Sequence, residues 1–176
     1  LLGSSSIKVT VTEDGKTQSV LFSGDIGNVD QPLIRNPDQP KDADFVVIES
    51  TYGDRLHGPR VDYTEQLRRV IQDTLDKGGN VVIPSFAVGR TQELIFELNK
   101  IYDSKDDPRQ KKLANVKVYI DSPMATSATE VFKKNAQVFD DETKDYISKG
   151  DNPLEFENLK FTQSTEESQW LNFDKE

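Results

Sequence analysis

Near its middle the sequence reads VVIPSFAVGRTQELI, residues 81–95. It opens with Val81-Val82-Ile83, a short β-branched run typical of a strand that is buried on both faces. A tight loop containing Gly89 follows, and apolar residues then recur at helical spacing over 94–101. The stretch therefore predicts one strand–loop–helix unit of an α/β protein.

The same alternation continues on both sides of this unit. Upstream, Phe45-Val46-Val47-Ile48 predicts a strand covered on both faces, and the apolar spacing over 63–75 predicts a helix that ends at Lys77-Gly78-Gly79. Downstream, residues 116–120 predict a strand and residues 127–135 a helix. We therefore expect an α/β fold with three layers, α/β/α, around a mostly parallel sheet.

The two ends of the sequence have local patterns of their own. An Asp14-Gly15 pair separates two strand-like runs within residues 7–22, which predicts a β-hairpin. Residues 28–44 contain several prolines and Asn/Asp residues and predict a connecting loop. Near the other end, Ser164-Thr165-Glu166-Glu167 has the form of a capping box, so we expect it to open a last helix that contains Trp170.

The composition excludes several kinds of protein. A length of 176 residues fits one domain, or one domain plus part of another. The absence of cysteine excludes disulfides and thiolate chemistry, and His57 is the only histidine, so this chain cannot alone form a site that needs two imidazoles. A net charge of −9 excludes a globally basic nucleic-acid binder. No apolar run approaches the roughly 18 residues of a membrane span, so we expect a cytoplasmic protein without a membrane partner.

Small or charged polar residues follow four of the predicted strands. In open parallel sheets, ligands bind beyond the carboxyl ends of the strands, so these residues should gather at one edge. Carboxylates there can bind a metal or act as acid and base. Each residue type is also common in turns, so the indication comes from all four stretches together. They are Ser23-Gly24-Asp25, Glu49-Ser50-Thr51, Pro84-Ser85-Phe86 and Asp121-Ser122-Pro123.

The loop over residues 84–91 predicts an anion site. A strand there runs into the start of a helix, where free backbone N–H groups and the Arg90 guanidinium would face the same edge. We therefore predict that Ser85, Arg90 and Ser122 bind substrate. The alternative for Arg90 is an ion pair with an acid on its own helix, such as Glu93. His57 lies in a glycine-containing loop and is expected to be exposed.

Three longer stretches, taken in order, resemble the β-CASP branch of the metallo-β-lactamase superfamily. This branch contains RNA-processing nucleases related to ribonuclease J and to the endonuclease that cleaves pre-mRNA 3′ ends. The order and spacing match over residues 1 to about 130, and a fourth stretch, YIDSPMA at 119–125, is also similar. The three are FSGDIG at 22–27, IESTYGDR at 48–55 and IPSFAVGRTQE at 83–93.

The resemblance implies catalytic residues and a cofactor. The family has a site for two zinc ions, built from histidine motifs and a bridging aspartate, and Asp25 matches that aspartate. Glu49 matches the acidic residue that supports the catalytic chemistry beside the metals. The other zinc ligands have no match in this sequence. We therefore expect an internal fragment of a zinc-dependent RNA phosphodiesterase, itself inactive and binding no zinc.

The resemblance also divides the chain. Residues 1–58 correspond to the C-terminal part of the metallo-β-lactamase-like domain, and residues 59–176 to a β-CASP domain that is incomplete at its C-terminal end. Residues 1–50 would then either pair onto the remaining strands or self-associate through an open edge, which would give a homodimer. Two other functions stay open, namely a non-catalytic nucleotide- or RNA-binding α/β module that uses the loop at 84–91, and a family member that serves as a scaffold.

Overall fold

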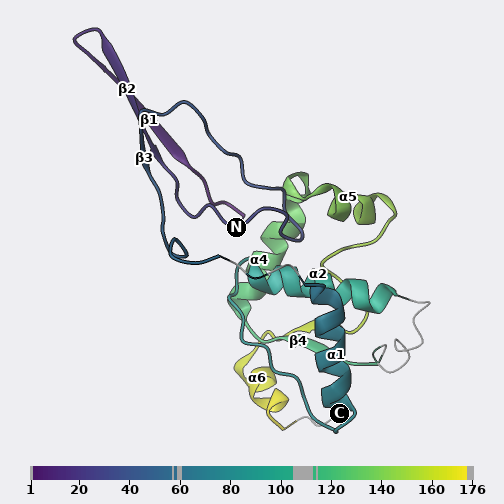
Figure 1. The fold of residues 1–176 in the computed structure, drawn as a ribbon. Coiled ribbons are helices and arrows are strands. Elements are labelled where there is room, and N and C mark those ends of the chain that lie inside the picture. The colour runs from purple at the N-terminus through teal and green to yellow at the C-terminus, as the bar shows by residue number, and fades with distance from the viewer. Residues whose placement is uncertain (1, 57, 59–60, 105–112, 114, 174–176) are drawn as a thin grey trace.

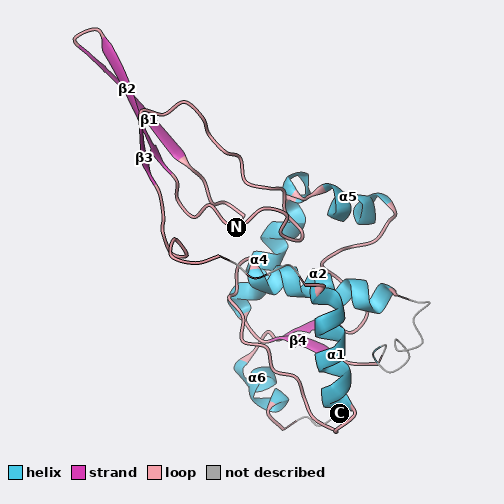
Figure 2. Cartoon of the chain, viewed as in Figure 1, coloured by secondary structure: helices cyan, strands magenta, loops and turns pink. Residues whose placement is uncertain are grey.

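The computed structural model describes residues 2–56, 58, 61–104, 113 and 115–173, and it places them in two regions. A three-stranded sheet projects from a body in which helices surround a small two-stranded sheet (Figure 1). Colouring by secondary structure shows that long loops connect the two regions (Figure 2). The predicted α/β class is confirmed, and parallel strand pairing occurs in both regions.

The projecting sheet begins with the predicted hairpin. Strands β1 (Ile7–Glu13) and β2 (Lys16–Phe22) pair antiparallel, and the turn residues Asp14 and Gly15 have φ angles of 50° and 75°. Two positive φ values between the strands match the right-handed twist of a hairpin, and an Asp-Gly pair accommodates them at low cost. Strand β3 (Phe45–Val47) then pairs parallel with β2, with Val20 opposite Phe45.

One face of this sheet is apolar and exposed. The strand register places on it Ile7, Val9, Val11, Phe22, Phe45 and Val47, which are 44–60% exposed. The prediction that Phe45–Ile48 is covered on both faces was therefore wrong for the described residues, since Val46 and Ile48 are exposed as well. Apolar residues favour burial, but an apolar run in the sequence does not show whether another part of the structure covers it.

The body contains the predicted helices. They are α1 (Tyr63–Leu75), α2 (Arg90–Asp103), α4 (Pro123–Lys134) and α6 (Thr165–Leu171). Helix α4 begins four residues before the predicted start because Ser122 caps it and Pro123 occupies its first turn. The Ser164 side chain caps α6 as predicted. Helix α5 (Asp141–Ser148) and the short 3₁₀ turn Ala136–Val138 were not predicted.

The predicted strand at Val81–Ile83 is absent from the described residues. Strand β4 (Val118–Ile120) instead pairs parallel with β5 (Leu159–Phe161), a strand that was not predicted from the sequence. Val81 packs against the smaller apolar cluster described below, but Val82 is 84% exposed and the run has no neighbouring strand among the described residues. Its β-propensity alone does not form a strand, because a strand depends on a pairing partner.

Two apolar clusters form the core of the body. The larger contains Leu33, Ile95, Phe96, Phe132, Phe139 and Leu154. The smaller lies between α1 and α2 and contains Ile71, Leu98, Ile101 and Leu113. Beside it, the Tyr102 ring stacks on Phe156 with centroids 4.6 Å apart, and burial raises the pKa of the Tyr102 hydroxyl to about 12. Among the described residues, no helix combines the length and apolar character needed to cross a membrane.

The segment 28–44 is more than the connecting loop that was predicted. Leu33 is fully buried in the larger cluster, and Ile34 forms an isolated bridge with Phe139. The Arg35 N–H donates to the Val138 carbonyl at 3.1 Å, and the Asp140 N–H donates to the Leu33 carbonyl at 3.2 Å. This segment therefore anchors the projecting sheet region to the helical body.

Candidate functional site

Hydrogen bonds connect the ends of β2 and β3, at the point where the predicted polar residues follow the two strands. The Ser23 N–H donates to the Val47 carbonyl at 2.9 Å, which extends the strand pairing by one residue. The Glu49 N–H donates to Ser23 Oγ at 3.2 Å, and that hydroxyl donates to the Gly24 carbonyl at 2.7 Å. Ser23 is buried, so the two strand ends form one unit that includes Asp25 and Glu49.

Both oxygens of the Glu49 carboxylate accept hydrogen bonds. Oε1 accepts from the Ile26 N–H at 3.1 Å, and Oε2 accepts from Thr51 Oγ1 at 2.9 Å. Glu49 is thus attached to the residue that directly follows Asp25. Of the residues predicted to meet at the edge, the structure brings Asp25 and Glu49 together in this way.

The turn that contains Asp25 is held from its other side by two serines near the start of the chain. Ser4 Oγ donates to the Asp25 carbonyl at 2.6 Å, and Ser6 Oγ donates to the Ser23 carbonyl at 2.8 Å. Gly24 has a φ of +58°, and a Cβ atom there would lie 2.7 Å from the Ser5 carbonyl oxygen. Only glycine allows this close approach. Sequence reasoning did not identify these serines as parts of the site.

A pocket of about 480 Å³ opens beside Asp25. Its lining includes the serine segment, Asp25 and the loop that contains Arg35 and Asp38. Among the described residues, none is shown to hydrogen-bond or pair with the Asp25 carboxylate, which leaves its oxygens available to a ligand. The pocket thus combines one open carboxylate with backbone that is held in place.

The described residues do not complete a zinc site. Within the described part of the chain, no group of three or more His, Asp or Glu side chains is arranged so that it could hold a metal ion. Zinc requires about four ligands per ion. Asp25 fits the part of one such ligand, because its carboxylate is open and its backbone is fixed on two sides. His57 lies outside the described residues, so its predicted exposure stays a prediction.

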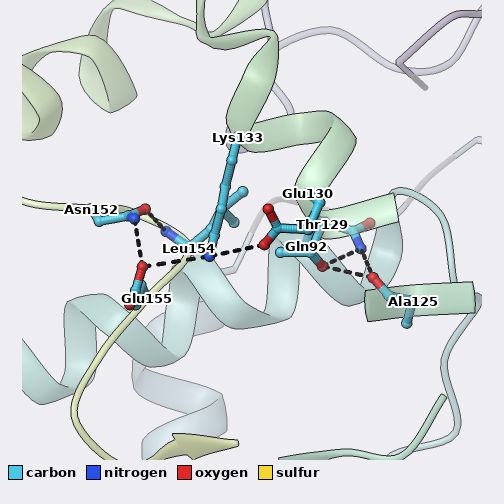
Figure 3. Close-up of polar contacts among 8 residues, drawn as sticks. All are labelled: Gln92, Ala125, Thr129, Glu130, Lys133, Asn152, Leu154 and Glu155. Carbon is cyan, nitrogen blue, oxygen red and sulfur yellow. Dashed lines mark hydrogen bonds and ion pairs between the residues drawn. The ribbon is translucent and has the colours of Figure 1, made fainter. Parts of the chain in front are cut away.

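The loop at 84–91 is fixed by two residues of α2. Thr91 Oγ1 donates to the Phe86 carbonyl at 2.8 Å and lies 3.3 Å from Ser85 Oγ. Gln92 is fully buried, and its Oε1 accepts from the Gly89 N–H at 2.7 Å. Its Nε2 lies within hydrogen-bond distance of the Ala87 carbonyl. Figure 3 shows that it also reaches two groups on α4, namely Thr129 Oγ1 and the Ala125 carbonyl.

Arg90 forms the ion pair with Glu93 that was predicted as the alternative to an anion site. Its guanidinium pairs with Glu93 at 2.7 Å and is 61% exposed. Burial raises the pKa of the Glu93 carboxyl, and the Arg90 charge opposes that rise. Two backbone donors at the start of α2 are already used, because the Thr91 N–H donates to the Phe86 carbonyl and the Gly89 N–H to Gln92. The helix start is therefore a weaker anion site than the sequence suggested.

The fourth predicted stretch has contacts that support the fold. Ser122 Oγ accepts from the Ala125 N–H at 3.2 Å, which caps α4. Asp121 does not cap α4 itself. Its Oδ1 accepts from Thr162 Oγ1 and its Oδ2 from Ser168 Oγ, each at 2.8 Å, so it joins the end of β4 to the end of β5 and to α6.

Replacing Gln92 by leucine should destabilise the protein by about 1–3 kcal/mol. The side chain keeps its approximate size, but the buried partners of the amide lose their hydrogen bonds. Urea unfolding of both proteins measures the difference. Gln66→Leu is the matched control, because Gln66 lies exposed on α1, where surface changes are usually within about 0.5 kcal/mol. Equal effects of the two substitutions would contradict the role assigned to Gln92.

The chain is similar to known ribonucleases. Residues 91–176 match the Beta-Casp domain. Ribonuclease TTHA0252 of Thermus thermophilus is 32% identical over 162 residues, which cover 92% of this chain and 36% of that protein. Endoribonuclease YSH1 of Kluyveromyces lactis is 30% identical over 152 residues, covering 84% of this chain and 19% of that protein. The chain thus spans about a third or less of these relatives.

Proposed function

Because residues 91–176 match the Beta-Casp domain and the chain resembles ribonucleases along most of its length, we propose that it is part of an RNA-cleaving metallohydrolase of the β-CASP branch. One observation supports this most directly. The open carboxylate of Asp25 and the carboxylate of Glu49 lie on one hydrogen-bonded unit, formed where two parallel strands end. In open α/β sheets, ligands bind beyond the carboxyl ends of the parallel strands.

Asp25 is the residue that we assign to the metal site. Zinc is the ion proposed, with two ions in the full-length protein, and Asp25 would be one of the residues that hold them. The remaining ligands would come from parts of that protein outside these 176 residues. When bound, the metal would supply Lewis acidity and an activated water for phosphodiester hydrolysis. The contribution of this chain is to hold the Asp25 segment rigidly through Ser4, Ser6 and Glu49.

The division of the chain follows from the same proposal. Residues 1–58 would belong to a metallo-β-lactamase-like domain and residues 59–176 to the β-CASP domain. The exposed apolar face of β1–β3 supports this division, because a sheet with such a face needs a covering layer to be stable in water. In the full-length protein that layer would come from the rest of the first domain. In the isolated chain the same face would favour self-association.

RNA is the proposed substrate, and Arg90 with Ser85 and Ser122 the proposed contacts to it. The Arg90 side chain is 61% exposed although its partner Glu93 is only 19% exposed, so a phosphate that approaches from solvent can reach the guanidinium and replace Glu93 as its partner. Charge-assisted bonds from arginine to phosphate are among the stronger hydrogen bonds.

Arg90→Ala in the full-length protein should therefore weaken RNA binding roughly tenfold, as a loss of about 1.4 kcal/mol implies. The salt dependence of binding should fall by about one phosphate contact. Glu93→Gln is the matched variant, because it frees Arg90 and should strengthen binding. Titrations of a labelled single-stranded RNA at three salt concentrations measure both. Unchanged affinity and salt dependence in Arg90→Ala would show that Arg90 serves only its helix.

Cleavage of the same labelled RNA by the full-length protein tests the catalytic part of the proposal. Appearance of shorter products supports it. Binding without cleavage would favour the alternative, a non-catalytic RNA-binding module or scaffold.

A further inference from the structure

We infer that Thr51 is a positioning residue for Glu49 and, through Glu49, for the backbone that carries Asp25. The inference rests on the proposed function and deepens it by adding a residue that supports the site. The connection consists of two hydrogen bonds in series. Thr51 Oγ1 donates to Glu49 Oε2 at 2.9 Å, and Glu49 Oε1 accepts from the Ile26 N–H at 3.1 Å.

Glu49 needs such a partner because its side chain is exposed. An exposed glutamate has three rotatable bonds and would sample several rotamers, at an entropy cost when it is held in one. The Ile26 N–H holds one oxygen, and rotation about the last bond could still move the other. The Thr51 hydroxyl engages that second oxygen, so the carboxylate is held at two points.

The Asp25 segment depends on this carboxylate for one of its supports. Ser4 and Ser6 hold the carbonyls of Asp25 and Ser23, and Glu49 holds the N–H of Ile26. The backbone on either side of Asp25 is thus fixed, while its carboxylate stays open. Outer residues that orient metal ligands are typically worth about 10- to 100-fold in metal affinity or activity.

The contact can be removed without disturbing the local backbone. Residues 50–55 form a turn with its own hydrogen bonds, from the Gly53 N–H to the Ser50 carbonyl at 3.0 Å and from the Arg55 N–H to the Tyr52 carbonyl at 3.3 Å. Thr51 is exposed, so loss of its hydroxyl leaves no buried polar group behind. Thr51→Val keeps the β-branched shape and deletes only the donor.

The experiment uses the full-length protein and three variants. Thr51→Val removes the hydroxyl, Thr51→Ser restores it, and Ser50→Ala removes the neighbouring hydroxyl, for which the structure shows no contact to Glu49. The measurements are kcat and KM on a labelled RNA, zinc affinity by competition with a chelating dye, and the melting temperature. The zinc titration gives a readout that does not depend on turnover.

We expect Thr51→Val to lower both kcat and zinc affinity by about tenfold, at the lower end of the range for outer residues, with KM and melting temperature close to the wild type. Thr51→Ser should restore both values, and Ser50→Ala should match the wild type. The inference is overturned if Thr51→Val behaves as wild type, or if Thr51→Ser is as impaired as Thr51→Val. A wild-type protein that neither binds zinc nor cleaves RNA would instead overturn the proposed function, and the inference with it.

Discussion

Asp25→Asn in the full-length protein is expected to lower the rate of RNA cleavage by at least about 100-fold. Outer residues around metal sites already cost about 10- to 100-fold when they are changed, so a direct ligand should cost more. Asparagine keeps the size of the side chain but loses the negative charge that would hold a cation. The contacts that fix this turn use the backbone of Asp25 and its neighbours, so the fold should survive.

The measurement is single-turnover cleavage of a labelled RNA by the wild type and the variant. Asp73→Asn is the matched control, because Asp73 is exposed on α1 and does not line the pocket beside Asp25. It should retain nearly the full rate. Near-normal cleavage by Asp25→Asn would mean that Asp25 is only a turn residue at a strand end.

Leu33→Ala is expected to destabilise the protein by about 2–5 kcal/mol, the usual cost of removing a large buried aliphatic side chain. Leu33 is fully buried among Phe96, Phe132, Phe139 and Leu154, although its own backbone has a φ of +79°. A leucine tolerates that conformation only where its surroundings enforce it. The burial of this side chain is therefore the main apolar contact that holds the segment 28–44 on the helical body, beside its backbone hydrogen bonds.

Urea unfolding of the wild type and Leu33→Ala gives the free-energy difference. Val29→Ala is the control from the same segment, since Val29 is 42% exposed and its truncation should have little effect. Protease cleavage within 28–44 should also become faster in Leu33→Ala. If both variants unfold at the same urea concentration as the wild type, the segment is not anchored through Leu33.

The elements predicted correctly from the sequence are those determined by residues that lie close together in the chain. The Asp14-Gly15 turn selects its hairpin, and Ser122 and Ser164 start their helices through side-chain hydrogen bonds over three residues. The strand at 81–83 was predicted from apolar character alone and failed, because its pairing depends on residues far away in the chain. β5 was missed for the same reason, since only β4 makes it a strand.

In the candidate site, too, some features could be predicted from the sequence and others could not. The meeting of Asp25 and Glu49 could be predicted because both follow strands, and parallel strands end at the same edge. Their supports could not. Ser4 is 21 residues from Asp25, and a threonine two residues after a glutamate has many other partners available. The helical pattern of the sequence does not show whether Gln92 is exposed or buried. Only the packing of α4 on α2 shows that the Gln92 amide is buried and fixes the loop.

Removal and return of metal in the full-length protein shows whether RNA cleavage depends on zinc. The protein is dialysed against a chelator until no zinc remains, and cleavage of a labelled RNA is measured before dialysis, after it, and after zinc is added back. We predict that cleavage is lost with the metal and returns as zinc approaches two ions per chain. Cleavage that persists without metal, or RNA that stays intact when zinc is bound, would contradict the account.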